Sequence, residues 1–163
     1  MSAAAIAALV LSLVSAFPGL QTGTLPEDVT IALERTSCFG DCPIYRVTID
    51  ARGNVIYEGR KFVAVSGRRT GRIPVARVAA ILATADRIGF FELRDHYRTV
   101  RGPDGSETVV TDLPTTIVTI TRAGVTKRVE DYYGAPRALQ ELERQIDEAA
   151  GTSQWVERKS PVR

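Results

Sequence analysis

Two stretches of the chain each predict a β-hairpin followed by an amphipathic helix, and this repeated order constrains the fold more than any other feature. In the first stretch, apolar and polar residues alternate over 45–49, a turn is predicted at Arg52-Gly-Asn54, and residues 55–58 return as the partner strand. In the second, residues 116–121 and 125–130, on either side of a Gly-containing turn, are rich in β-branched residues, which favour strands. Alternation with a period of two is typical of strands that bury one face. We therefore expect two hairpins that contribute to one sheet.

A helix is predicted after each hairpin. Apolar residues recur at helical spacing between Pro74 and Gly89, and again between Pro136 and Gly151. Each amphipathic helix needs a surface to cover, and a further alternating strand is predicted over 30–35. The expected fold is α+β: an antiparallel sheet built from two ββα-like units, with two helices packed on one face. Residues 66–72 are expected to be a loop or a ragged edge, and residues 94–111, which contain Gly102-Pro-Asp-Gly105, are expected to be irregular.

The N-terminus has the features of a secretion signal. Residues 1–16 form an apolar run that ends in small residues, which predicts cleavage after Ala16 and a periplasmic or secreted protein. The run has no Lys or Arg before it, so an uncleaved anchor or another start site stays open. We expect a linker over 17–28, one α+β domain over 29–156 and a disordered tail over 157–163. The mature chain offers no apolar run of the roughly 20 residues that a transmembrane helix needs.

The charge of the chain gives no indication of a nucleic-acid partner. Its 21 Lys and Arg nearly balance its 19 Asp and Glu. Locally, however, the region 59–85 holds six basic residues and no acid. Its arginines Arg68, Arg69 and Arg72 are candidates for binding an anionic envelope polymer or another envelope protein. The alternative is a solvated loop whose arginine stems cover apolar surface.

Cys38 and Cys42 are the two cysteines of the chain. An even count in an exported protein predicts a disulfide, and so short a loop gives a stabilisation of only about 2 kcal/mol. The Cys-x3-Cys-Pro spacing also resembles that of copper-delivery proteins of the Sco type. A thiol-redox or Cu(I) site made of Cys38, Cys42 and His96 is therefore an alternative, although we expect no cofactor and no metal.

A second group of candidate binding residues stands at predicted strand ends. Their carboxylates and hydroxyls would meet if neighbouring strands end at the same edge of the sheet; the residues are Asp112, Thr115, Thr116, Asp131, Tyr132 and Tyr133. No nucleophile with its base and orienting group is evident in the sequence, so we expect no catalytic residues and no enzymatic activity. The leading interpretation is a non-enzymatic binding module of the bacterial envelope. A hydrolase or inhibitor-like module acting on envelope polymers is the other alternative.

Four segments together carry a family resemblance. Residues 33–49, 57–59, 111–116 and 129–136 resemble the bacterial family catalogued as domain of unknown function 6438, over about 29–155. The resemblance implies no activity. It implies that the Cys-x3-Cys turn, the Thr-Asp-Leu-Pro-Thr-Thr segment and the Glu-Asp-Tyr-Tyr-Gly segment are hallmark positions of the family. We therefore expect these three segments to lie close together.

Overall fold

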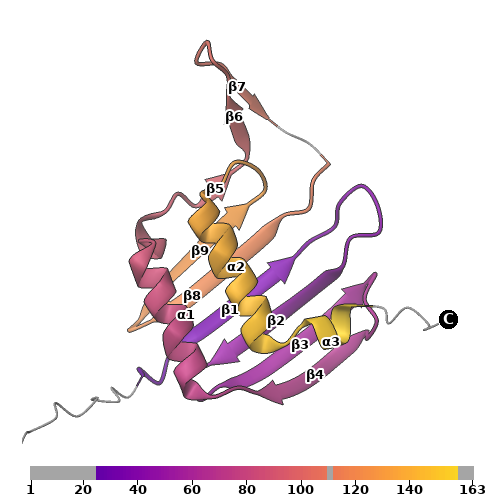
Figure 1. Ribbon diagram of the computed structural model, residues 1–163, viewed down its shortest axis with the longest axis vertical. Coiled ribbons are helices and arrows are strands. Elements are labelled where there is room, and N and C mark those ends of the chain that lie inside the picture. Colours follow the sequence, from indigo (N-terminus) through magenta and orange to yellow (C-terminus); the bar gives the residue numbers. More distant parts are fainter. Residues whose placement is uncertain (1–24, 110–111, 158–163) are drawn as a thin grey trace, which may run out of the picture.

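The computed structural model describes residues 25–109 and 112–157, and within them seven strands form one sheet (Figure 1). The strand order is β4-β3-β2-β1-β8-β9-β5. The strands are β1 (Thr30–Arg35), β2 (Ile44–Asp50), β3 (Asn54–Lys61), β4 (Gly67–Arg72), β5 (His96–Tyr97), β8 (Thr116–Arg122) and β9 (Val125–Asp131). All neighbours are antiparallel except β5, which pairs in parallel with β9. The predicted α+β fold with a mostly antiparallel sheet is thus confirmed.

Both helices lie on the same face of this sheet (Figure 1), as the sequence predicts. Helix α1 (Val75–Arg87) buries Val78, Ile81 and Leu82, and helix α2 (Arg137–Ala150) does the same with its own apolar stripe. The strand residues that point toward the helices, such as Leu33 and Val47, complete the core between sheet and helices. The opposite phase is largely polar, so the second face of the sheet carries Thr, Arg and Glu side chains.

Two predicted loops contain strands. The stretch 66–72, expected to be a loop or a ragged edge, contains the edge strand β4, which pairs with β3 along six positions. Its six residues are all exposed, so no apolar alternation marks it in the sequence, and its pairing with β3 alone makes it a strand. The stretch 94–111 contains β5 and a small hairpin of β6 (Thr99–Arg101) and β7 (Glu107–Val109), with the Gly102-Pro-Asp-Gly105 segment as its turn.

A short helical segment follows each of the two main helices. After α1, a 3-10 turn (η1, Phe90–Glu92) buries Phe90 completely. After α2, the short helix α3 (Ser153–Val156) stacks Trp155 on Tyr57, with ring centroids 4.9 Å apart. None of the described helices is long and apolar enough to cross a membrane. The predicted signal peptide, the linker as far as residue 24, and residues 158–163 of the predicted tail lie outside the described residues.

Candidate functional site

The loop between β1 and β2 is closed by the predicted disulfide. Cys38 and Cys42 are bonded, with Cα atoms 5.8 Å apart, and the described residues include no free cysteine. Gly40 lies between them with φ 148°, a conformation that side-chain-bearing residues rarely adopt. The bridge leaves the Phe39 ring outside, and this residue is 91% exposed. The loop is therefore a small closed unit with an aromatic side chain at its tip.

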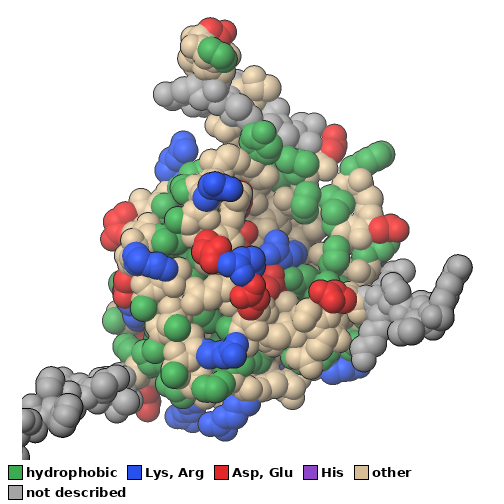
Figure 2. All heavy atoms as spheres, in the orientation of Figure 1, with side chains coloured by type: hydrophobic (Ala, Val, Ile, Leu, Met, Phe, Trp, Pro, Cys, Tyr) green, Lys and Arg blue, Asp and Glu red, His purple; other side chains and the backbone are tan. Residues whose placement is uncertain are grey.

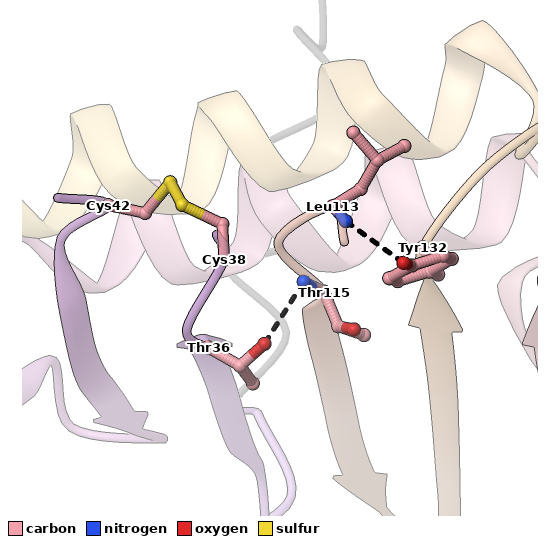
Figure 3. The surroundings of a disulfide bond; sticks show 6 residues. All are labelled: Thr36, Cys38, Cys42, Leu113, Thr115 and Tyr132. Carbon is pink, nitrogen blue, oxygen red and sulfur yellow. Dashed lines mark hydrogen bonds between the residues drawn. A yellow bond between two sulfur atoms is a disulfide. The ribbon is translucent and has the colours of Figure 1, made fainter. Parts of the chain in front are cut away.

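Two other segments hold this loop in place (Figure 3). The backbone N–H of Thr36 donates to the carbonyl of Thr115 at 3.0 Å, and the N–H of Thr115 donates to the Thr36 hydroxyl, also at 3.0 Å. The N–H of Phe39 donates to the carbonyl of Asp112 at 3.4 Å. The N–H of Leu113 in turn donates to the hydroxyl of Tyr132 at 2.9 Å. The three family segments thus lie side by side at one end of the sheet.

We call this end of the sheet the stapled end; it comprises residues 36–43, 112–115 and 132–133. Its outer surface is rich in apolar groups, because Phe39, Leu113 and Tyr133 are all exposed. Figure 2 shows hydrophobic side chains gathered at the upper right, over the stapled loop. A patch of large apolar side chains on a loop fixed by hydrogen bonds and a disulfide is a candidate contact surface.

Beneath the stapled end, a row of polar residues crosses the helix-covered face of the sheet. Cross-strand pairing aligns Tyr45, Arg35, Thr116 and Asp131 on β2, β1, β8 and β9. The Arg35 guanidinium donates to the Tyr45 hydroxyl at 3.1 Å and to the Thr116 hydroxyl at 3.0 Å. Arg35 thus ties together the strands on both sides of β1.

Helix α2 adds two carboxyl groups to this row. Asp147 accepts hydrogen bonds from Arg35 at 2.8 Å, from the Tyr45 hydroxyl at 2.8 Å and from the Thr152 hydroxyl at 2.8 Å. Glu143, one helical turn earlier, is only 5% exposed, and its Oε1 has no hydrogen-bond partner among the described residues. We call Arg35, Tyr45, Thr116, Asp131, Glu143, Asp147 and Thr152 the Arg35 cluster.

Two carboxyl groups of the cluster, Glu143 on α2 and Asp131 on β9, have raised pKa values. Burial and the nearby charge of Asp131 raise the pKa of Glu143 to about 8, although Arg35 counteracts this. Burial also raises the pKa of Asp131, while a hydrogen bond from Gln140 and the charge of Arg35 act in the opposite direction. Glu143 is therefore protonated at neutral pH.

A protonated Glu143 near the carboxyl group of Asp131 is a combination of groups that enzymes use for acid–base catalysis. Here, however, both side chains are buried, so a substrate has no access to them. Asp131 is 9% exposed and Glu143 is 5% exposed. A hollow of about 250 Å³ beside the cluster is lined by Tyr45, Asp147 and residues of α3, and not by either of these two acids. The Arg35 cluster accordingly joins α2 to four strands, and its chemistry is that of a structural brace.

His96 lies away from the cysteines in the topology. It belongs to β5, and its Nδ1 is 3.1 Å from Oε2 of Glu130, which also accepts hydrogen bonds from Arg98 and Arg128. Burial tends to raise the pKa of Glu130, but the hydrogen bonds from the two arginines and His96 lower it to about 2. Over the described residues, no group of three His, Cys, Asp or Glu side chains is arranged to hold a metal ion.

The other candidate residues divide between two places. Thr115, Thr116, Asp112, Asp131 and the two tyrosines come together at or just beneath the stapled end, as their position at predicted strand ends suggested. Arg68, Arg69 and Arg72 all lie on β4, at the far edge of the sheet. The sequence candidates therefore do not form a single site.

The family model described as Domain of unknown function (DUF6438) matches residues 29–150. The chain belongs to this family. No match to the chain is found among curated proteins. The DUF6438 match begins one residue before β1 and ends with the last residue of α2, so it includes the whole stapled end and all of the Arg35 cluster except Thr152.

The sequence reasoning missed several residues of this region of the DUF6438 domain. Arg35 follows Ile31 and Leu33 in the buried phase of β1, and Glu143 lies in the apolar stripe between Leu139 and Ile146. A charged residue at a position where the pattern predicts a buried apolar side chain indicates a buried polar network. The exposure of Phe39, by contrast, has no signal in the local sequence.

Proposed function

We propose that this protein is a non-enzymatic binding module of an extracytoplasmic compartment, and that it holds a partner protein at the stapled end. The observation that carries the proposal is the 91% exposure of Phe39 on a loop closed by the Cys38–Cys42 disulfide. Leaving a large aromatic side chain in water forgoes about 2 kcal/mol of burial free energy. Its burial by a partner would recover that free energy.

The loop is also preorganised for binding. The disulfide and the hydrogen bonds from Thr36, Phe39 and Thr115 fix its backbone before any partner arrives. Association costs less when the contacting segment loses little conformational freedom. Leu113 and Tyr133, on the two segments that adjoin this loop, are exposed as well and offer further apolar surface. A buried aromatic anchor surrounded by smaller contacts is the usual composition of a binding hot spot.

Two features support the proposed extracytoplasmic compartment. The apolar run over 1–16 has the features of a secretion signal, and disulfides persist where the environment is oxidising. The bonded cysteines and the pairing of His96 with Glu130 give no support to thiol-redox or Cu(I) chemistry. The burial of Asp131 beneath α2 gives none to hydrolysis of an envelope polymer.

Site-specific photo-crosslinking in the cells that produce the protein tests this proposal. A benzoylphenylalanine at position 39 should yield one discrete crosslinked protein. The matched control places the same group at Val125, which is also apolar and exposed (57%) but begins β9 at the opposite end of the sheet. Equal crosslinking patterns from the two positions, or none from position 39, would contradict a partner at the stapled end.

A further inference from the structure

Strand β4 is a free edge of the sheet and carries an unusual concentration of positive charge. It pairs with β3 on one side only, and all six of its residues are exposed. Three of the six are arginines: Arg68, Arg69 and Arg72. Charged residues on an edge strand help to prevent aggregation through strand pairing. That role does not require three guanidinium groups without a counter-charge.

About half of the arginines whose side chains are described form ion pairs with carboxylates, and the arginines of β4 belong to the other half. Seven arginines form ion pairs with carboxylates over the described residues: Arg35, Arg46, Arg60, Arg98, Arg122, Arg128 and Arg144. Arg68, Arg69 and Arg72 form none with any described residue. Glu58, the acid of β3, is opposite Arg68 in the register and shares a face with Arg68 and Arg72, whereas Arg69 is opposite Tyr57.

The spacing of these charges determines what can bind. Arg68 and Arg72 share one face of β4, with the hydroxyl of Thr70 between them, because residues two apart in a strand point the same way. Four residues of strand separate their Cα atoms by about 13 Å. Side chains of a strand stand roughly perpendicular to the sheet, so the two guanidinium groups lie about as far apart as the Cα atoms unless they bend toward each other. A ligand that engages both must carry several anionic groups along a chain.

An extended polymer fits this edge better than an added peptide strand. The Arg69 guanidinium donates to the backbone carbonyl of Arg68 at 2.7 Å, so one acceptor of β4 is already occupied. A peptide strand binds an edge through backbone hydrogen bonds, whereas a polyanion binds through the guanidinium groups alone. Arginine suits this role because its planar fork pairs with two oxygens of one phosphate.

We propose that the β4 edge binds a linear phosphate-bearing polyanion through Arg68 and Arg72, with Arg69 adding positive charge from the other face of the strand. This surface lies on a different strand from the stapled end and takes a different kind of ligand, so the inference stands independently of the proposed function. Binding is multivalent: each phosphate contact is weak, and a chain that spans the strand gains affinity because its later contacts form within one complex.

The test measures binding of long-chain inorganic polyphosphate to the full chain and to two triple variants. The first is Arg68→Gln, Arg69→Gln, Arg72→Gln. The control removes the same charge from exposed arginines elsewhere: Arg94→Gln, Arg137→Gln, Arg144→Gln. We expect at least a tenfold loss of affinity in the first variant and less than a threefold loss in the second. Circular dichroism confirms the fold of both variants, since every substituted residue is exposed.

Two further measurements make the outcome decisive. Affinity of the unsubstituted protein should fall by at least tenfold when tripolyphosphate replaces the long chain, and it should fall steeply with added salt. Equal losses in both triple variants would mean that only net charge matters, and would overturn the proposal. Equal affinity for tripolyphosphate and the long chain would also overturn it, as would tighter binding of an acidic peptide than of polyphosphate.

Discussion

Replacement of Glu143 by glutamine is expected to stabilise the protein, and the gain should grow with pH. Glu143 is 5% exposed, its Oε1 has no hydrogen-bond partner among the described residues, and Asp131 adds a like charge nearby. These surroundings raise its pKa from 4.5 to about 8. A glutamine has nearly the same shape and never carries a charge.

The sign and the size of the effect follow from proton linkage. Below pH 4.5 both the folded and the unfolded chain keep the Glu143 proton, so the group has no pH-dependent effect. Between pH 4.5 and 8 the unfolded chain has released that proton while the folded chain keeps it, so the free energy of unfolding falls as pH rises. The fall is about 1.4 kcal/mol per pH unit, and about 5 kcal/mol over the whole interval.

Urea unfolding at pH 5, 6.5 and 8 measures the effect. The free energy of unfolding of Glu143→Gln relative to the unsubstituted protein should increase by about 4 kcal/mol between pH 5 and pH 8. The matched control is Glu141→Gln on the exposed face of the same helix, where the hydrogen bond from Arg144 lowers the pKa of Glu141. This control should show no such increase. A stability difference for Glu143→Gln that stays constant from pH 5 to pH 8 would refute the reasoning.

Three further predictions concern stability and can be measured by the same unfolding experiments. Gly53→Ala should lower the free energy of unfolding by more than about 3 kcal/mol, because φ is +79° and the added Cβ would lie 2.1 Å from a backbone carbonyl oxygen. Gly124→Ala, where φ is +75° but the added Cβ would meet open space, should lower it by about 1 kcal/mol. Equal losses for the two variants would contradict this argument. Arg35→Ala should cost about 3 kcal/mol because it leaves a carboxylate in the cluster without its cation, and a loss below 1 kcal/mol would argue against the brace. Joint replacement of Cys38 and Cys42 by serine should lower the free energy of unfolding by about 2 kcal/mol and leave a folded domain. Complete unfolding would show that the disulfide does more than fix a local loop.

The predictable part of the fold is the part in which local pattern and tertiary burial agree. The burial of residues along β2, β3 and β8 alternates because one face of each strand lies toward the core, and both helices carry an apolar stripe at helical spacing. β4 gave no signal because all of its residues are exposed, and β5 is only two residues long. These edge strands exist because a neighbour pairs with them, which is information that their own residues do not contain.

The candidate site was predictable to a similar degree. The spacing of Cys38 and Cys42 in an exported chain indicates a disulfide, and the family resemblance indicates that three segments meet. The Arg35 cluster could have been inferred from charged residues in buried phases, but their partners depend on how α2 lies across the sheet. The outward direction of Phe39 depends on the closed loop as a whole, so only the structure reveals it.

The most direct test of the proposed function is the affinity of the partner captured through position 39. The captured protein is purified, and its affinity is measured by titration calorimetry for the unsubstituted chain, for Phe39→Ala and for Val125→Ala. Loss of a central aromatic anchor is expected to weaken binding at least tenfold, or about 1.4 kcal/mol, whereas Val125→Ala should leave the affinity unchanged. Both side chains are exposed, so neither substitution should lower the free energy of unfolding. Unchanged affinity for Phe39→Ala would contradict the account of the stapled end as a protein-binding surface.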